Sequence, residues 1–597
     1  MLQEEFPRPD FVRPRLRMLN GRWDFNISKA DDIAIDDIYN YFIEVPYLPH
    51  TELSNLNLTV DGNFLWYRKK FKITKAELAG TIILNFAGVK GNTEVFLNGV
   101  SIGTNAFSFS PFAFNISDFA VEGINTLVLK VSSTKEQMLL ENIGVWQNIW
   151  LEFASKTFIE NLHTQAGLKS SQIFLQGKIK NISDEMKMEI SLYCQGKKIL
   201  SSTYLAQETI NIQLKIPTPL KYWNPGDGNI YDIKIILKNK IGGICDTIYT
   251  YCAFREISIV ENNLAINGTQ VFLRQIRDKL IYPDSKNTIS SIAQIKQDLS
   301  LVLKLGFNGV YVEGSIPDPR YLYIADKLGL LVTIAFDGLG YNVDNKNDLN
   351  MLINEIDRII IRDYRHPSIV IWSPISNYFG SKEPSVELYN SIRQSDPTRL
   401  ISSVAGGYQY YTDIYDKRIF TDDLEFFKET VLYATNGPLL SPKDEEKLLK
   451  SNPSLLNPDI LHEMPLYISG FGVYPLSQEF GLPAFKEEDF LFYYKRYVEI
   501  IRESGAMGYV YADLYDSSTK GWGLYDFRRN QKISDRAILE LRATNLEKSN
   551  LEKKGLETLE QQKIIAKQMQ QNTQNHTCFM QPPQGANTTI QMPPIHQ

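Results

Sequence analysis

Alternation of apolar and polar residues dominates the first 256 positions of the chain. Residues 66–73, 81–86 and 93–97 alternate with the period of two that half-buried strands show, and so do residues 172–179 and 189–193. Asn98-Gly99 is a strong two-residue hairpin signal between residues 94–97 and 100–102. Turn residues recur about every ten positions, which is typical of antiparallel sandwiches. We therefore predict a jelly-roll β-sandwich over residues 1–155 and an immunoglobulin-like β-sandwich over residues 156–256.

The pattern changes near residue 257, where short apolar runs begin to alternate with helix-length segments. Helices are expected over residues 289–305 and 320–328, and a third ends near Tyr364. Strand-length runs occupy residues 271–274, 307–312, 330–335, 369–372, 400–404, 466–469 and 508–511, with a sixth strand of the series expected near 418–421. Repeated strand–helix units of this size predict a (β/α)₈ TIM barrel over residues 257–545. The fold class is therefore multidomain, β followed by α/β.

The last fifty residues have a different composition. Residues 546–567 are rich in Glu, Lys, Gln and Leu, which indicates a charged, solvated helix. Residues 568–597 contain no Asp, Glu, Lys or Arg, and a tail dominated by Gln, Asn, Thr and Pro is expected to be disordered. Residues 546–597 are either an unselected extension or a segment for binding a protein partner or forming a homo-oligomer.

Composition excludes several classes of function and favours one cell compartment. The net charge is −6 and no basic stripe stands out, which disfavours nucleic-acid binding. No apolar run approaches the length of a membrane span, and charges in the first twenty residues leave no room for a signal core. The four cysteines are too few for a disulfide framework or a zinc site. We expect a cytoplasmic protein with no cofactor, no metal and no membrane partner.

Candidate chemistry lies in the stretch 362–377. The helix before it ends at the His366-Pro367 step, where a structural role for the histidine is expected, and the apolar run 369–372 reads as a buried strand. Ser373, Ser376 and Asn377 follow at the strand end, which is the active-site face of a βα-barrel. This stretch resembles glycoside hydrolase family 2, the β-galactosidases, β-glucuronidases and β-mannosidases, in which a His-Pro-Ser helix exit precedes Ile-x-Trp-Ser-x-x-Asn-Glu. Ser376-Asn377 stands where the family has Asn-Glu.

Further motifs carry the resemblance over about residues 20 to 545. Five lie in the predicted jelly roll, in the family's order: Leu19-Asn-Gly-Arg-Trp-Asp-Phe25, Val45-Pro-Tyr-Leu-Pro-His50, Tyr67-Arg68, Phe96-Leu-Asn-Gly-Val100 and Gly144-Val-Trp-Gln-Asn-Ile-Trp150. The segment 222–231 resembles the family's second domain, and 521–529 resembles its exit from the barrel. The resemblance implies a sugar-binding-like first domain that supports the barrel.

The same resemblance implies that both catalytic glutamates are missing. Retaining glycosidases need two carboxylates about 5 Å apart, one as nucleophile and one as acid/base. The family's acid/base position maps to Asn377. Its nucleophile position maps to Gly470, within Pro465-Leu-Tyr-Ile-Ser-Gly-Phe-Gly472. Asparagine is a poor proton donor and glycine has no side chain. Our first hypothesis is a non-hydrolytic carbohydrate-binding, scaffold or interaction protein.

Two other hypotheses stay open. An active β-glycosidase would need relocated carboxylates, for example Glu313 with Asp513; acids expected at strand ends are Glu313, Asp337, Asp513 and Asp516, which could equally be solvated loop acids or helix caps. A structural subunit would assemble through its tail. If a sugar binds, the predicted ligand-binding residues are Tyr311, Trp372, Ser376, Asn377, Tyr511 and Trp522.

Overall fold

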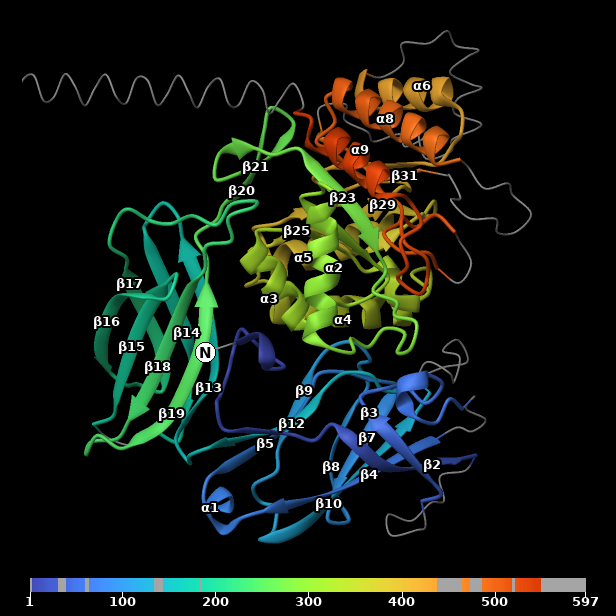
Figure 1. Ribbon diagram of the computed structural model, residues 1–597. Coiled ribbons are helices and arrows are strands. Elements are labelled where there is room, and N and C mark those ends of the chain that lie inside the picture. The colour runs from blue at the N-terminus through green and yellow to red at the C-terminus, as the bar shows by residue number, and fades with distance from the viewer. Residues whose placement is uncertain are drawn as a thin grey trace, which may run out of the picture. The chain divides into compact units, whose positions relative to one another are not determined.

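The computed structural model describes residues 3–29, 39–58, 64–133, 143–182, 185–436, 464–472, 486–517 and 521–548. The described residues as far as 547 belong to one compact unit that contains two β-sandwiches and a parallel barrel sheet (Figure 1). Nearly all of the predicted charged helix and the whole predicted disordered tail lie outside the described residues, so those predictions stay as they are.

The first sandwich packs a six-stranded sheet against a four-stranded one. The six-stranded order is β3 (Tyr41–Val45), β2 (Gly21–Ser28), β4 (Phe64–Ile73), β10 (Gly123–Ser132), β7 (Asn92–Leu97) and β8 (Val100–Asn105). The four-stranded order is β1 (Leu16–Met18), β12 (Ile149–Ala154), β5 (Thr81–Phe86) and β9 (Phe112–Asn115). Asn98 and Gly99 have φ of 53° and 85°, as the favoured two-residue hairpin turn requires. The predicted β7–β8 hairpin is confirmed.

The second sandwich follows directly. Its three-stranded sheet contains β13 (Phe158–Gly167), β14 (Gln172–Lys180) and β17 (Thr209–Lys215). Its four-stranded sheet contains β16 (Lys197–Leu205), β15 (Lys187–Cys194), β18 (Tyr231–Lys238) and β19 (Ile244–Cys252). In β15 every second side chain is buried, namely Met188, Ile190, Leu192 and Cys194. The period of two in the sequence therefore reports this buried face.

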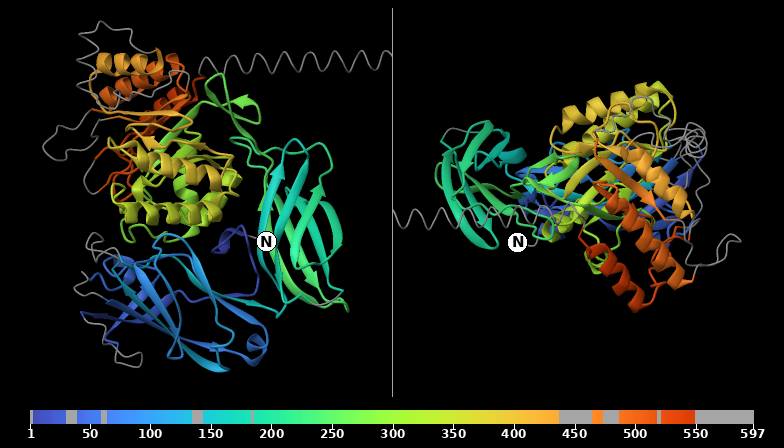
Figure 2. Two further views of the ribbon diagram at one scale, coloured as in Figure 1. Left: turned by 180° about the vertical axis from the view of Figure 1, so that it is seen from behind. Right: turned by 90° about the horizontal axis from the view of Figure 1, so that it is seen from above.

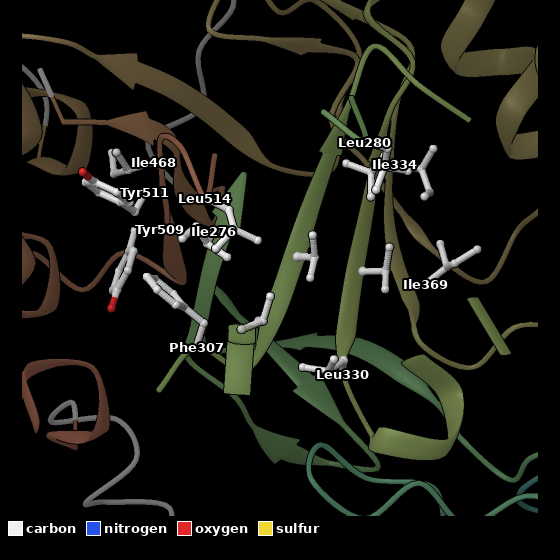
Figure 3. Close-up of a cluster of buried hydrophobic side chains, with 14 of the residues drawn as sticks. Ile276, Leu280, Phe307, Leu330, Ile334, Ile369, Ile468, Tyr509, Tyr511 and Leu514 are labelled. Atoms are coloured by element: carbon white, nitrogen blue, oxygen red, sulfur yellow. The ribbon is translucent and has the colours of Figure 1, made fainter. Parts of the chain in front are cut away.

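The third part is a parallel eight-stranded sheet in barrel order. Its strands are β28 (Leu400–Ile401), β26 (Ile369–Ser373), β25 (Leu331–Ala335), β24 (Gly309–Glu313), β23 (Leu273–Asp278), β32 (Gly508–Tyr511), β31 (Leu466–Phe471) and β30 (Tyr415–Ile419). The helices that cover it are α2 (Ile292–Lys304), α3 (Pro319–Leu328), α4 (Lys346–Asp363), α5 (Lys382–Ser395), α6 (Leu424–Asn436), α8 (Glu487–Glu503) and α9 (Asp535–Leu546) (Figures 1 and 2). Outward-facing strand residues such as Ile276, Ile334 and Tyr509 belong to the buried cluster between sheet and helices (Figure 3). The predicted TIM-barrel fold is confirmed.

The barrel departs from the expected strand–helix repeat between its fifth and sixth strands. The predicted strand 400–404 splits into β28 and β29 (Val404–Ala405), and β29 leaves the barrel sheet to pair with β27 (Ile375–Ser376). Residues 402–414 are all described and contain no helix. At Gly407 a Cβ would approach Tyr378 O to 2.3 Å, so this connection runs too close to its neighbour for a larger residue. The sixth strand begins at Tyr415, three residues before the predicted position.

The N-terminal end of the barrel is closed by the second sandwich and the segment after it. Leu264 and Ile266 of β21 (Asn263–Ile266) join Trp223 in one buried cluster with inward-facing barrel residues such as Leu273 and Ile371. The indole of Trp223 donates to Asp326 O at 2.7 Å. This plug fills the barrel interior at that end, so the C-terminal ends of the strands are the expected place for an active site.

Lys90 of β6 (Val89–Lys90) is buried where the first sandwich meets the barrel. It is 6% exposed, and its Nζ lies 3.4 Å from Asn287 Oδ1 and 5.0 Å from the centre of the Trp146 ring. Burial lowers the pKa of Lys90 to about 8. Above that pH the lysine is neutral in the folded protein while it is still charged in the unfolded chain.

Replacing Lys90 with Met is expected to stabilise the protein at pH 7 by about 1–3 kcal/mol. The folded pKa lies below the unfolded value, so the charged lysine opposes folding below about pH 8 and this penalty fades towards pH 10.5. Urea unfolding at pH 7 and pH 9.5 should show the advantage of K90M shrinking at the higher pH. Lys169→Met, at a side chain that is 90% exposed, is the control. A stability difference that does not change with pH would contradict this assignment.

Candidate active site

Four charged side chains meet at the C-terminal ends of the barrel strands. Arg277 of β23 lies between two carboxylates: its Nη1 is 3.2 Å from Glu313 Oε2, and its Nε donates to Asp513 after β32. Arg418 of β30 holds the other oxygen of Glu313, with Nη2 to Oε1 at 2.6 Å. Each of these side chains is at most 8% exposed. We call Arg277, Glu313, Arg418 and Asp513 the mouth network.

The mouth network keeps Glu313 ionised. Burial by itself raises the pKa of Glu313, but Arg418 and Arg277 outweigh it and bring the pKa below its ordinary value. The two carboxylates act in return on Arg277, whose pKa they raise despite its burial. A general acid must carry a proton at working pH, so a carboxylate held in this way is poorly suited to protonate a leaving group.

Sequence reasoning did not assign a role to either arginine. Arg277 and Arg418 each lie inside a barrel strand that also carries other polar residues, and their inward positions become meaningful only with the strand register. A charged residue inside a barrel strand is the signal that could have found them, because an unpaired buried charge is costly and therefore needs a partner.

Asp337 lies beside the network but in a different electrostatic setting. It follows β25 with φ of 52°, and Ser376 Oγ donates to its carboxylate. A Cβ added at Gly314, the residue after Glu313, would be 3.7 Å from Asp337 Oδ2. Burial is the main cause that raises the pKa of Asp337, and nearby Glu313 adds to it. Glu313 and Asp337 are thus neighbouring carboxylates whose pKa values are displaced in opposite directions.

The two positions that the sequence resemblance assigns to the family's glutamates differ in their surroundings. Asn377 is exposed, with φ of 49°, and its backbone N–H donates to Ala405 O at 2.8 Å. Gly470 is buried in β31, and a Cβ there would come within 2.8 Å of Phe420 Cζ. Phe420 is 39% exposed and packs against Trp522, with ring centroids 5.6 Å apart. Phe420 thus occupies the space next to Gly470 and forms an aromatic pair with Trp522.

Three of the predicted ligand-binding residues do not face the mouth. Tyr311 is fully buried inside the barrel, where its hydroxyl accepts from Arg418 at 3.0 Å. Trp372 points into the helix layer and donates its indole N–H to Asp396 at 2.8 Å. Tyr511 lies among Ile468 and Tyr509 in the same layer (Figure 3). For Trp372 and Tyr511 the reason is the strand period: Ile371 and Val510 face the interior, so the residues after them face outward.

The remaining predicted acid, Asp516, is already bound to other groups of the protein. Asp516 accepts from Lys532 Nζ at 2.8 Å and from the backbone N–H of Gly523 at 2.7 Å. Burial raises the pKa of Asp516 although Lys532 opposes the rise. The structure therefore brings Glu313, Asp337, Asp513 and Ser376 together and leaves Asp516 in its own ion pair.

Metal ligands and membrane-spanning helices can be assessed for the described residues alone. Within them, no three His, Cys, Asp or Glu side chains form a group that could hold a metal ion. In the same part of the chain, no helix is both long and apolar enough to cross a membrane.

Comparison with known proteins gives two family matches. Residues 257–438 match the glycosyl hydrolases family 2 TIM barrel domain, and residues 33–165 match the glycosyl hydrolase 2 galactose-binding domain-like family. The barrel match includes Asn377 and ends before Gly470.

Similar proteins carry related names. A putative beta-glucuronidase of Formosa agariphila is 26% identical over 380 residues, which is 60% of this chain and 45% of that protein. A beta-galactosidase of Lactococcus lactis is 24% identical over 409 residues, 65% of this chain and 39% of that protein. The chain thus matches less than half the length of these relatives. The solved Bifidobacterium dentium beta-glucuronidase complexed with coumarin-3-O-glucuronide shares the fold, with a TM-score of 0.69, 16% identity and coverage of 90% and 97% of the two chains. Two family models, curated relatives and a shared three-part fold agree that this chain belongs to glycoside hydrolase family 2.

Proposed function

We propose that this chain is a non-hydrolytic member of the family that binds carbohydrate at the barrel mouth. One observation carries the proposal: the space into which a side chain at Gly470 would project is taken by the Phe420 ring. The second catalytic position holds Asn377, which cannot donate a proton as a carboxylic acid does. Double displacement needs both carboxylates, so neither half of the usual retaining reaction has its residue.

The aromatic pair supports the binding half of this proposal. Sugar rings present apolar C–H faces that pack on aromatic side chains, while a few polar groups fix their orientation. Phe420 and Trp522 provide such a face, and Ser376, Asn377 and Asp337 provide polar groups at neighbouring strand ends. The ligand named for the Bifidobacterium protein is a glucuronide, so uronides belong in the first panel of sugars.

The direct test is hydrolysis of aryl β-galactosides, β-glucuronides, β-glucosides and β-mannosides by the purified protein. We expect no turnover above the blank for any of them. Calorimetry with the corresponding free sugars is expected to show binding that Trp522→Ala abolishes and Trp522→Phe partly keeps. Phe492→Ala, at an exposed aromatic residue on α8, is the matched control. If no sugar binds, the carbohydrate part of the proposal fails and a scaffold role remains.

One observation favours an active enzyme as the second candidate. Glu313 with a lowered pKa and Asp337 with a raised pKa are the combination that assigns a nucleophile and an acid in glycosidases. This pair differs from the Glu313–Asp513 pair expected from sequence. The non-hydrolytic proposal would be overturned if the protein hydrolysed a substrate and if Glu313→Gln and Asp337→Asn each abolished that hydrolysis. Both variants must keep the circular dichroism of the unmodified protein. Turnover abolished by Asp513→Asn but not by Asp337→Asn would restore the original pair.

Assembly through residues 546–597 remains a third proposal, as does a cytoplasmic location. Deleting residues 549–597 and measuring the mass by light scattering tests the first of these. If the deletion leaves the oligomeric state unchanged, the tail does not drive assembly.

A further inference from the structure

A cavity lies at the opposite end of the barrel from the mouth. It has a volume of about 520 Å³ and is bounded by β13 and the chain after β19 on the sandwich side. On the barrel side it is bounded by the connections that lead into β26 and β28. Arg255, Arg365 and Arg399 all line it. Small-molecule sites typically occupy about 300–1,000 Å³, so the cavity is large enough for a metabolite.

Two of these guanidinium groups converge on one backbone carbonyl. Arg255 Nη1 donates to Ile369 O at 2.8 Å, and Arg399 Nε donates to the same oxygen at 3.4 Å. Arg399 is otherwise satisfied, since Nη1 lies 3.3 Å from Asp396 Oδ2 and Nη2 donates to His366 O at 2.8 Å. The third guanidinium, of Arg365, is ion-paired with Asp10. Two of the three positive charges in the cavity wall therefore have their own carboxylates.

Arg255 is the exception. Among the described residues no carboxylate lies within ion-pair distance of it, and its hydrogen bond to Ile369 O uses one of its five N–H donors. The acids that line the cavity have cations elsewhere: Asp396 pairs with Arg399, and Glu256 lies 3.6 Å from Lys169. Burial, followed by the repulsion of Arg399, lowers the pKa of Arg255 well below its ordinary value. This positive charge is held at a cost that a bound anion would offset.

We propose that this cavity is a binding site for a small oxyanion, a phosphate or carboxylate group, that Arg255 grips with its free N–H donors. The planar guanidinium matches the paired oxygens of phosphate and carboxylate, and hydrogen bonds between charged groups are about twice as strong as neutral ones. Because Arg255 follows the second sandwich and Arg399 belongs to the barrel, the anion would join the two parts and stabilise their junction. This site is independent of the sugar site proposed at the mouth.

The test is thermal unfolding and calorimetry of the full chain with inorganic phosphate and with acetate, each matched in ionic strength by sodium chloride. At least one of the two anions is expected to raise the unfolding midpoint of the unmodified protein saturably. Arg255→Met is expected to weaken that effect at least about tenfold. Arg255→Lys, which keeps the charge without the planar fork, should fall between the two.

Two controls make the outcome decisive. Arg536→Met, at a guanidinium that is 83% exposed on α9, should respond to the anion as the unmodified protein does. Without added anion, Arg255→Met should be at least as stable as the unmodified protein, because it removes a partly buried charge that has no carboxylate partner among the described residues. Equal responses of the unmodified protein and Arg255→Met would overturn the proposal, as would the absence of a response to either anion. A large loss of stability in anion-free buffer would also overturn it, since Arg255 would then be a structural residue.

Discussion

Replacing Arg277 with Met will lower the free energy of unfolding by about 3–5 kcal/mol, because it leaves Glu313 and Asp513 buried without their shared cation. Both carboxylates contact this guanidinium and are at most 8% exposed. Removing one partner of a buried ion pair costs more than the pair contributes, since the remaining charges keep their desolvation penalty. Urea unfolding followed by circular dichroism measures the loss.

Two comparisons separate this cause from simple loss of packing. Arg277→Met combined with Asp513→Asn should recover much of the stability, because Asp513 then carries no charge while Glu313 keeps its ion pair with Arg418. Arg496→Met, at an exposed pair with Glu499, should change the stability by less than about 1 kcal/mol. If this double variant were as unstable as Arg277→Met alone, charge would not be the cause.

The effect of pH has a defined sign. The folded pKa of Glu313 is lowered, so its contribution to stability is complete above the unfolded value and is lost as the pH falls through the folded value. In Arg277→Met the ionised form of Glu313 has lost one of its two arginine partners and is less stabilised. Protonation of Glu313 at low pH therefore costs this variant less stability than it costs the unmodified protein. The gap in stability between the two proteins should therefore narrow as the pH falls from 7 towards 4.

Replacing Asp326 with Ala should cost about 3–5 kcal/mol, because a fully buried charged acceptor disappears from a network that joins the second sandwich to the barrel. Asp326 accepts from Tyr251 of β19 at 2.7 Å and from the backbone N–H of Ser368 at 2.9 Å. His366 Nδ1 lies 2.7 Å from the same carboxylate. All three donors are left buried when the carboxylate is removed. Denaturant unfolding is again the measurement.

Two further variants set the scale for the loss of stability expected at Asp326. Tyr251→Phe removes one hydroxyl donor and should cost about 1–2 kcal/mol. Asp357→Ala, whose half-buried carboxylate accepts from Ser391 and Ser395 at the helix surface, should cost about 1 kcal/mol. A loss at Asp326 no larger than that at Asp357 would show that the junction is held by apolar packing instead. The network also explains His366, whose predicted structural role agrees with its place at the closed end of the barrel, away from the mouth.

Membership of the family does not by itself fix the chemistry at the barrel mouth. A barrel is stabilised by its inward and outward apolar layers, whereas catalysis depends on a few side chains at strand ends. In this chain apolar clusters line both faces of the barrel sheet, while the strand ends carry ion pairs between buried arginines and carboxylates. Because these arginines and carboxylates pair with one another, fewer charged groups are available to bind a substrate.

The fold could be predicted from the sequence because its signals are local. Alternation over a few residues reports one buried face of a strand, and Asn98-Gly99 specifies a hairpin through its own backbone preferences. The change of period near residue 257 is equally local and indicates the barrel. The prediction failed between β28 and β30, where a short connection without a helix replaces the expected unit. No local period marks such a connection, because its course depends on the loop of Tyr378 packed against it.

For the candidate site, the sequence determined only which residue stands at each position. Asn377 and Gly470 are visible in the printed chain, and the absence of carboxylates there needs no structure. The partners of the remaining acids were decided by tertiary structure: Arg277 meets Asp513 across 236 positions, and Phe420 fills the space beside Gly470. Side-chain direction also depends on register, which turned Trp372 and Tyr511 away from the mouth and placed Asp337 beside Glu313. The physical reason is that periodicity reports which residues are buried, whereas the partner of a buried charge is set by strand register and packing between distant segments.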